Sequence, residues 1–224
     1  MEQLKKIKLF SRLPEETLKW LNSKVTWEEF DKGSYLFREG EIAEKTYLVV
    51  KGSVKIVKEF SSGKNAIMGI FGPGSLVAEV AAVDNRPYPA SCVALESSSA
   101  GAVPAKVFQE LLKKEPNVAI MMIAGLGYKL RELTENLGAI SVMPVDKRLA
   151  RLLHKLAPSM GVKSASNVEI TLHMTRRDMA EIIGTSFEVV ERSLKKFRED
   201  NLISVDGKKI TIHDYQKLEE MFED

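Results

Sequence analysis

Residues 175–198 read TRRDMAEIIGTSFEVVERSLKKFR, and this stretch decides the fold of the C-terminal part of the chain. Two short amphipathic helical patterns flank Gly184. Thr175 and Thr185 each begin a Ser/Thr-x-x-acid pattern, which is typical of the first residues of a helix. The spacing predicts a helix-turn-helix whose second helix could enter the major groove of DNA.

The outer face of the second helix carries side chains suited to DNA. Carboxylates can accept from cytosine, arginine can bind guanine with two hydrogen bonds, and lysine can bind phosphate. The alternative is an ordinary helical hairpin with a solvated charged face. The residues predicted to contact DNA are Thr175, Arg176, Ser186, Phe187, Glu188, Glu191, Arg192 and Lys195.

The composition is that of a globular protein with its positive charge concentrated in one region. The chain has 224 residues, enough for two modest domains, and its 44% hydrophobic and 29% charged residues are typical of a globular protein. The net charge is only +2, so DNA binding must be argued locally. Residues 144–210 hold 13 Lys and Arg against 9 Asp and Glu, whereas residues 211–224 hold 1 against 5. Positive charge therefore gathers around the helix-turn-helix.

Cysteine content and hydropathy exclude several classes of protein. The single cysteine, Cys92, rules out an intramolecular disulfide and a four-cysteine iron–sulfur or zinc site, and no metal site is expected. Cys92 is expected to be a small buried hydrophobe on a strand. No apolar run reaches the roughly 18 residues that span a bilayer, and no signal peptide opens the chain. We therefore expect a cytoplasmic protein without a membrane partner.

The remaining segments divide by their periodicity. Residues 1–24 are predicted to be helical, and 25–105 contain short strands, such as 47–50 and 54–57, between glycine turns, as in a β-sandwich or barrel. A helix is predicted over 145–156, followed by a loop over 157–168. A hairpin is predicted over 202–212, with its turn at Asp206-Gly207.

A long helix is predicted over 106–143, with a break at Glu115-Pro116 and an end at Met143-Pro144, a candidate hinge. Apolar residues recur along it at alternating steps of 4 and 3, which is the a/d pattern of a coiled coil. The alternative is packing against the chain's own β-domain. We predict that this seam forms a homodimer through Ala119, Ile123, Leu126, Leu130, Leu133, Leu137 and Ile140.

At five places the chain resembles the Crp/Fnr family of bacterial transcription regulators. Residues 31–41 resemble the family's early β-turn signature, 47–54 the following strand pair, and 72–75 the approach to its ligand pocket. The segment 188–192 has the family's Glu-x-x-x-Arg spacing, and 201–204 precedes the wing as in the family. The resemblance covers nearly the whole chain.

The resemblance implies an α+β fold with three parts. Residues 1–115 would form an effector-sensing β jelly roll of the cyclic-nucleotide-binding type with N-terminal helices. Residues 116–143 would form the dimerisation helix. Residues 144–224 would form a winged helix-turn-helix DNA-binding domain.

The ligand pocket departs from the family's cyclic-nucleotide binders. In those proteins a Gly-Glu pair is followed about nine or ten residues later by an arginine, which pairs with the cyclic phosphate, while the glutamate binds the ribose hydroxyl. Here the glutamate is Glu79, the glycine is Ala78, and the arginine position falls on Tyr88 or Pro89. Because a buried phosphodiester without its cation is costly, cyclic AMP is not the expected effector.

Two further elements belong to the predicted pocket. Arg86 is a candidate substitute cation, although an arginine after a turn is more often solvated. The family's hydroxyl pair that contacts the base falls at Leu133 and Thr134. The predicted effector pocket consists of Ala78, Glu79, Val80, Arg86, Tyr88, Pro89, Ala90, Leu133 and Thr134.

Other effectors fit the sequence to different degrees. A haem has weak support, because His154, His173 and His213 all lie in the DNA-binding half. A haem in the sensor domain would need Cys92, a methionine, a tyrosine or a backbone nitrogen as its ligand. Another small organic or anionic ligand is the leading expectation, and a family member that needs no ligand is the next.

The resemblance also implies how DNA would be read. Arg192 would contact a guanine, Glu188 the amino group of a cytosine, and Thr175, Arg176 and Ser186 the phosphates. Phe187 stands where some relatives carry a second guanine-reading arginine, so a palindrome with a TTGA-like half-site is expected. Phe187 would either touch a thymine methyl or pack inward.

No nucleophile–base pair, metal-ligand cluster or phosphate loop is present in the sequence, so no enzyme activity is expected. Two functions remain. The first is a dimeric, effector-controlled, sequence-specific DNA-binding regulator, with RNA polymerase as a partner if it is an activator. The second is a cyclic-nucleotide-responsive or ligand-independent module whose C-terminal part binds protein. Glu188 and Arg192 favour the first.

Overall fold

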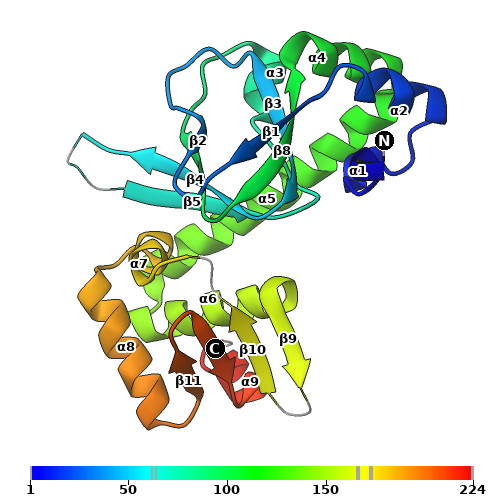
Figure 1. Ribbon diagram of the computed structural model, residues 1–224. Coiled ribbons are helices and arrows are strands. Elements are labelled where there is room, and N and C mark those ends of the chain that lie inside the picture. The colour runs from blue at the N-terminus through cyan, green and yellow to red at the C-terminus, as the bar shows by residue number, and fades with distance from the viewer. Residues whose placement is uncertain (1, 62, 64, 165–166, 172–173, 223–224) are drawn as a thin grey trace. The chain divides into compact units, whose positions relative to one another are not determined.

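The computed structural model describes residues 2–61, 63, 65–164, 167–171 and 174–222, and it has the expected α+β fold (Figure 1). The chain forms two compact units, residues 1–130 and 131–224. In the described residues, no helix is long and apolar enough to cross a membrane.

Two four-stranded antiparallel sheets form the centre of the first unit, as in a jelly roll. The strands predicted at 47–50 and 54–57 are confirmed as parts of β3 and β4. The first sheet has the order β1 (Thr26–Phe30), β8 (Ser98–Pro104), β3 (Lys45–Lys51) and β6 (Leu76–Val77). The second has the order β2 (Tyr35–Phe37), β7 (Ser91–Ala94), β4 (Val54–Glu59) and β5 (Asn65–Phe71).

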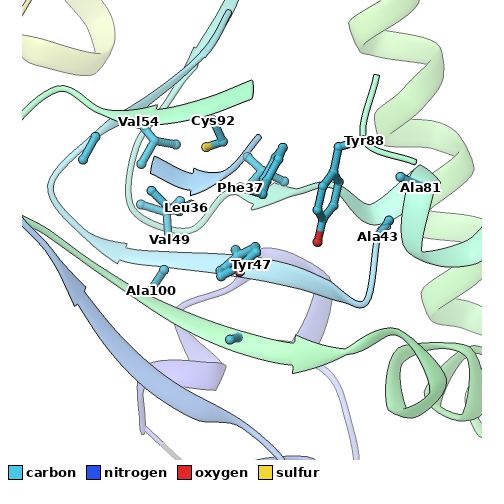
Figure 2. Close-up of a cluster of buried hydrophobic side chains, with 13 residues drawn as sticks. Leu36, Phe37, Ala43, Tyr47, Val49, Val54, Ala81, Tyr88, Cys92 and Ala100 are labelled. Carbon is cyan, nitrogen blue, oxygen red and sulfur yellow. The ribbon is translucent and has the colours of Figure 1, made fainter. Parts of the chain in front are cut away.

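An apolar core fills the jelly roll, and Figure 2 shows its side chains converging from several strands. Three aromatic rings form a row within it: Phe37 stacks on Tyr47 at a centroid distance of 5.8 Å and on Tyr88 at 4.1 Å. Cys92 is fully buried on β7, as the sequence predicts, and burial raises the pKa of its thiol.

The turn between β3 and β4 requires glycine. Gly52 has a φ of +74°, and a Cβ there would lie 2.3 Å from Ser98 Oγ. Only a residue without a side chain allows this close approach together with a left-handed backbone.

Helices cover the jelly roll and build a second apolar cluster. The predicted helical segment 1–24 is instead three short helices: α1 (Glu2–Lys5), the 3₁₀-helix η1 (Lys8–Phe10) and α2 (Glu15–Asn22). The chain restarts at Pro14, which precedes the first turn of α2, because proline fixes φ and has no N–H to donate. The other helices are α3 (Glu79–Asp84), α4 (Ala105–Lys114) and α5 (Pro116–Val142), so the predicted break at Glu115-Pro116 is confirmed.

The second unit is a winged helix-turn-helix. Its helices are α6 (Val145–Met160), α7 (Arg176–Ile183), α8 (Phe187–Glu199) and α9 (Tyr215–Glu220), and its sheet has the order β11 (Ile203–Asp206), β12 (Lys209–Ile212), β10 (Asn167–Thr171) and β9 (Gly161–Ser164). The predicted wing hairpin is confirmed, but its two-residue turn is Gly207-Lys208, one residue later than predicted, because Asp206 pairs with Lys209.

The predicted loop over 157–168 is wrong. Helix α6 continues to Met160, with Pro158 inside it, and the chain then enters the strand pair β9 and β10. Strand β10 is stabilised by its pairing with β12, some forty residues later, which buries Val168 and Ile170. Local composition cannot reveal such a long-range pairing.

The start of α7 confirms the predicted capping box. The Thr175 hydroxyl accepts from the Asp178 N–H at 3.1 Å, and the Asp178 carboxylate accepts from the Thr175 N–H at 2.7 Å. The second predicted start, at Thr185, is wrong, because the Thr185 N–H still donates to the Ala180 carbonyl at the end of α7. Ser186 is the N-cap residue of α8 instead.

Thr175→Ala is expected to lower the free energy of unfolding of the second unit by about 1 kcal/mol, because the hydroxyl that accepts from the Asp178 N–H is lost. Thr185→Ala is the matched control and should change stability by less than about 0.5 kcal/mol. Chemical denaturation of the two variants measures the difference. Equal stabilities would contradict the assignment of the cap to Thr175.

Candidate DNA interface and ligand cavity

Helix α8 has one buried and one exposed face. Val190, Leu194 and Phe197 are buried, whereas the predicted DNA contacts Glu188, Arg192 and Lys195 are exposed. Phe187, at the first turn, is 41% exposed, which favours contact with DNA over inward packing. Of the other predicted contacts, Thr175 and Ser186 are also exposed, at the starts of α7 and α8.

Arg176 and Glu191 pair across the turn of the helix-turn-helix. Arg176 Nε lies 2.5 Å from Glu191 Oε1, and both side chains are partly exposed. The pair neutralises the carboxylate that would otherwise repel a DNA phosphate beside Arg176. The two residues were predicted as separate DNA contacts, and their mutual pairing was not predicted.

Glu188 is held ionised at the start of α8. The Ser186 hydroxyl donates to its carboxylate, its own backbone N–H and Arg177 add to the effect, and together they lower the pKa of Glu188. An ionised carboxylate accepts hydrogen bonds only, which is what recognition of a cytosine amino group needs.

The first turn of α6 supports α8 from behind. Asp146 accepts from the Ser193 hydroxyl at 2.5 Å and from Lys196 Nζ at 2.9 Å. These two hydrogen bonds, together with the nearby Arg192 charge, lower the pKa of the Asp146 carboxyl. The recognition helix is therefore fixed to α6 on the side opposite its exposed face.

Arg148, one helical turn into α6, terminates α7. Its Nη1 donates to the Ile183 carbonyl and lies 3.4 Å from the Gly184 carbonyl. Gly184 has a φ of +65° and ends α7 in the left-handed conformation that glycine favours. A cation at the C-terminal carbonyls also complements the helix dipole.

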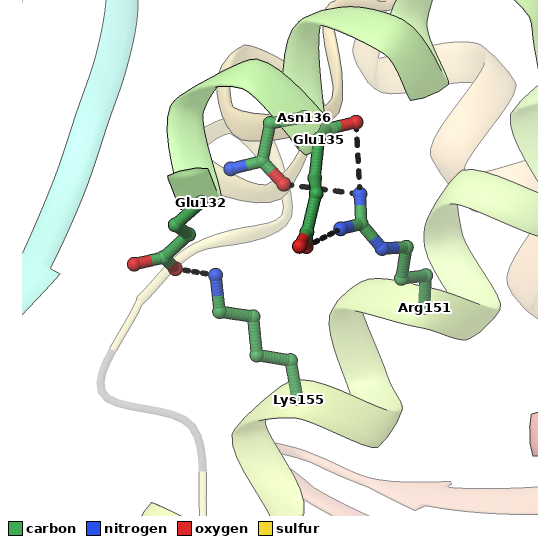
Figure 3. A network of polar contacts seen from close by, with 5 residues as sticks. All are labelled: Glu132, Glu135, Asn136, Arg151 and Lys155. Carbon is green, nitrogen blue, oxygen red and sulfur yellow. Dashed lines mark hydrogen bonds and ion pairs between the residues drawn. The ribbon is translucent and has the colours of Figure 1, made fainter. Parts of the chain in front are cut away.

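A polar network joins the end of α5 to α6, and Figure 3 shows its five residues. Arg151 bonds the Glu135 carboxylate at 3.0 Å and the Asn136 side chain at 3.1 Å, and Lys155 pairs with Glu132. The network brackets the break between Val142 and Val145, where the sequence predicts a hinge. None of these pairs was predicted, because their members lie 15 to 23 residues apart.

The apolar seam of α5 is exposed. Ile123, Leu130 and Leu137 are each 66% exposed, and Leu133 and Ile140 are 43% and 44% exposed. Val118, beside the seam, is buried in the apolar cluster that the helices of the first unit build. Ala119 and Leu126 are partly buried, and Leu126 also lines a cavity of the first unit, so among the described residues most of the seam, but not all of it, lacks the cover that the alternative interpretation required.

A cavity of about 220 Å³ opens in the first unit between the jelly roll and α5. Most of its wall is apolar and includes the side chains of Phe37, Phe71 and Leu126. Six of the predicted pocket residues line it: Ala78, Glu79, Val80, Tyr88, Pro89 and Ala90.

Arg86 does not line this cavity, so the structure favours the alternative of a solvated arginine over a substitute cation. Its side chain is 82% exposed, and its Nε lies 3.9 Å from Asp84 Oδ2. Leu133 and Thr134 belong to the second unit, and their place in the pocket stays a prediction.

Tyr88 is one of the two residues, with Pro89, on which the family's arginine position falls, and both line the cavity. Its ring is only 4% exposed, and its hydroxyl donates to the Lys45 carbonyl at 2.7 Å and accepts from the Lys45 N–H at 3.3 Å. Burial is the main reason why the pKa of Tyr88 is raised. A neutral phenol with both bonds already made cannot pair with a phosphate.

The cavity does contain a cation that the sequence analysis missed. Lys129 Nζ lies 2.7 Å from Glu79 Oε1 and 5.1 Å from the centre of the Phe71 ring. Lys129 is one helical turn after Leu126, so both side chains reach the same wall. Its spacing from Leu126 was the only sequence signal that could have placed it there.

The histidines relevant to a haem lie outside this cavity or outside the described residues. His154 stacks on Tyr215 at 4.3 Å within the second unit, and His213 is exposed there. His173 lies outside the described residues.

Comparison with known proteins agrees with both units. A cyclic nucleotide-binding domain matches residues 27–115, and a Crp-like helix-turn-helix domain matches residues 147–221. The CRP-like cAMP-activated global transcriptional regulator of Mycobacterium tuberculosis is 24% identical over 97% of each chain. FixK2 from Bradyrhizobium japonicum superposes with a TM-score of 0.79 at 22% identity, covering 88% of this chain and 96% of its own. The c-di-GMP responsive global regulator CLP of Xanthomonas campestris has a TM-score of 0.77 at 22% identity, covering 89% and 99%.

A jelly roll of the cyclic nucleotide-binding type followed by a winged helix-turn-helix defines a class of DNA-binding proteins. The chain belongs to the Crp/Fnr family within that class, and it is a DNA-binding transcription regulator of the Crp/Fnr type. This answers the choice between the two functions in favour of DNA.

Proposed function

We propose that the chain acts as a homodimer that binds a palindromic DNA site through α8 and responds to a small-molecule effector other than cyclic AMP. The seam of α5 would form the dimer, because three of its residues are 66% exposed in a single chain. Burying such a stripe against a second copy is the usual fate of an a/d seam.

One observation carries the DNA-reading part of the proposal. Arg192 and Glu188 are exposed one turn apart on α8, while Ser193 behind them is tied to Asp146. A helix held rigidly on one face can present the other to the major groove. A gel shift on a palindromic probe with half-sites roughly 34 Å apart tests this reading.

Arg192→Ala is expected to weaken binding by about 1–3 kcal/mol and to relax the preference at one base pair, because a bidentate contact to guanine is lost. Lys195→Ala is the control and should weaken binding about equally for all sequences. Fluorescence anisotropy with duplexes carrying each base at that position separates the two. An unaltered base preference in the Arg192 variant would refute the assignment.

The proposed effector differs from cyclic AMP because of the cavity's chemistry. The position of the arginine in the family's cyclic-nucleotide binders falls on Tyr88 or Pro89, neither of which carries a charge, and the cavity has a volume of about 220 Å³. That is below the roughly 300–1,000 Å³ of sites for drug-sized ligands. The relatives themselves are named for two different effectors, cAMP and c-di-GMP, so the fold alone does not select one.

A further inference from the structure

The ion pair in the cavity is asymmetric. The Glu79 side chain is only 9% exposed, whereas the Lys129 side chain is 38% exposed. Of the described side chains that line the cavity, only these two carry a charge. A buried carboxylate needs a donor at all times, while a long lysine side chain can place its ammonium in water at little cost.

This asymmetry decides which ligand charge the cavity accepts. An anionic ligand would draw Lys129 away from Glu79 and leave two negative charges together in an apolar site. A ligand with its own N–H donor could instead donate to the Glu79 carboxylate in place of Lys129, whose ammonium would then move into solvent. The cavity therefore selects against acids and in favour of amines.

The walls indicate the rest of the ligand. Phe37, Phe71 and Tyr88 line the cavity, and aromatic rings prefer ring partners in stacked or edge contacts. Lys129 Nζ lies 5.1 Å from the Phe71 ring centre. A ligand ammonium at the same position would contact both the Glu79 carboxylate and the face of this ring. A dry cavity of about 150 Å³ in another protein holds benzene, so 220 Å³ admits one ring with a short side chain.

We propose that the cavity takes a small arylalkylamine, whose ammonium displaces Lys129 from Glu79. This deepens the proposed effector control and rests on it. Lys129 then takes the place of the ligand's ammonium: when no amine is bound, it pairs with Glu79 and links α3 to α5. Binding would break that tie on the helix that carries the exposed seam.

Calorimetry on the full chain with three matched probes tests the proposal: 2-phenylethylamine, 2-phenylethanol and phenylacetate. The amine should bind tightest and phenylacetate weakest. Glu79→Gln should weaken binding of the amine at least about 10-fold. It should strengthen binding of phenylacetate, because Lys129 then no longer has a carboxylate partner. Lys129→Met should increase the affinity for the amine, because the ammonium that competes for Glu79 is gone. This second variant tests the proposal even if the Glu79 variant does not fold.

Three results would overturn the proposal: tighter binding of phenylacetate than of the amine to the unaltered protein, no effect of either variant, or no binding of any probe at about 10 mM. DNA affinity, measured by anisotropy with each probe, separates this proposal from effector control itself. If the amine binds through Glu79 without changing DNA affinity, the proposal of an amine site is supported and the proposal that an effector controls DNA binding is contradicted. If phenylacetate binds best and changes DNA affinity, effector control stands and the amine proposal falls.

Discussion

Leu130→Glu combined with Leu137→Glu is expected to yield a monomer that has lost specific DNA binding. Both side chains are 66% exposed, so the change should leave the fold of each chain intact while placing two charges in the centre of the dimer seam. A single recognition helix reads only one half-site, and losing the second should reduce affinity at least about 100-fold.

Light scattering gives the mass of the variant, and anisotropy on a palindromic probe gives its affinity. Ala124→Glu with Tyr128→Glu is the matched control, since both residues are exposed on the side of α5 away from the seam. The control should remain dimeric and bind DNA. An unchanged dimer mass in the Leu130 and Leu137 variant would mean that the copies associate elsewhere.

Cyclic AMP is expected to bind about 100- to 1,000-fold more weakly than it would bind a pocket with the arginine. The reason is the loss of one partner of a buried charged pair, commonly about 3–5 kcal/mol, or about two to three decades of affinity. Lys129 cannot replace that partner without leaving Glu79 unpaired, and Tyr88 has both hydroxyl bonds occupied by Lys45.

Calorimetry with cyclic AMP and cyclic GMP measures this, with DNA anisotropy as the second readout. Neither nucleotide should bind in the micromolar range, and neither should raise DNA affinity. Micromolar binding of cyclic AMP with enhanced DNA affinity would show that another group supplies the cation and that the effector assignment is wrong.

Most features with a local physical cause were predicted correctly, although the start of α8 was placed at Thr185 and not at Ser186. The Thr175 cap, the turn at Gly184 between the two helices and the interruption at Pro116 each depend on residues within one turn of each other. The amphipathic pattern of α8 likewise gave its buried face correctly, because the period of a helix alone decides which residues share a side.

Features that depend on distant partners were missed. Strand β10 is ordered by β12, and the Arg151 network joins two helices across a break. In the cavity, the sequence pattern identified Glu79 and the absence of an arginine, but Lys129 comes from a helix fifty residues later. No periodicity links such residues, since only the folded jelly roll and α5 bring them together.

Selection of binding sites from random DNA by the unaltered protein tests the central claim most directly. The account predicts an enriched palindrome with TTGA-like half-sites whose centres lie roughly 34 Å apart, read by one α8 helix from each copy. Enrichment of a single unpaired site, or of no sequence at all, would contradict it.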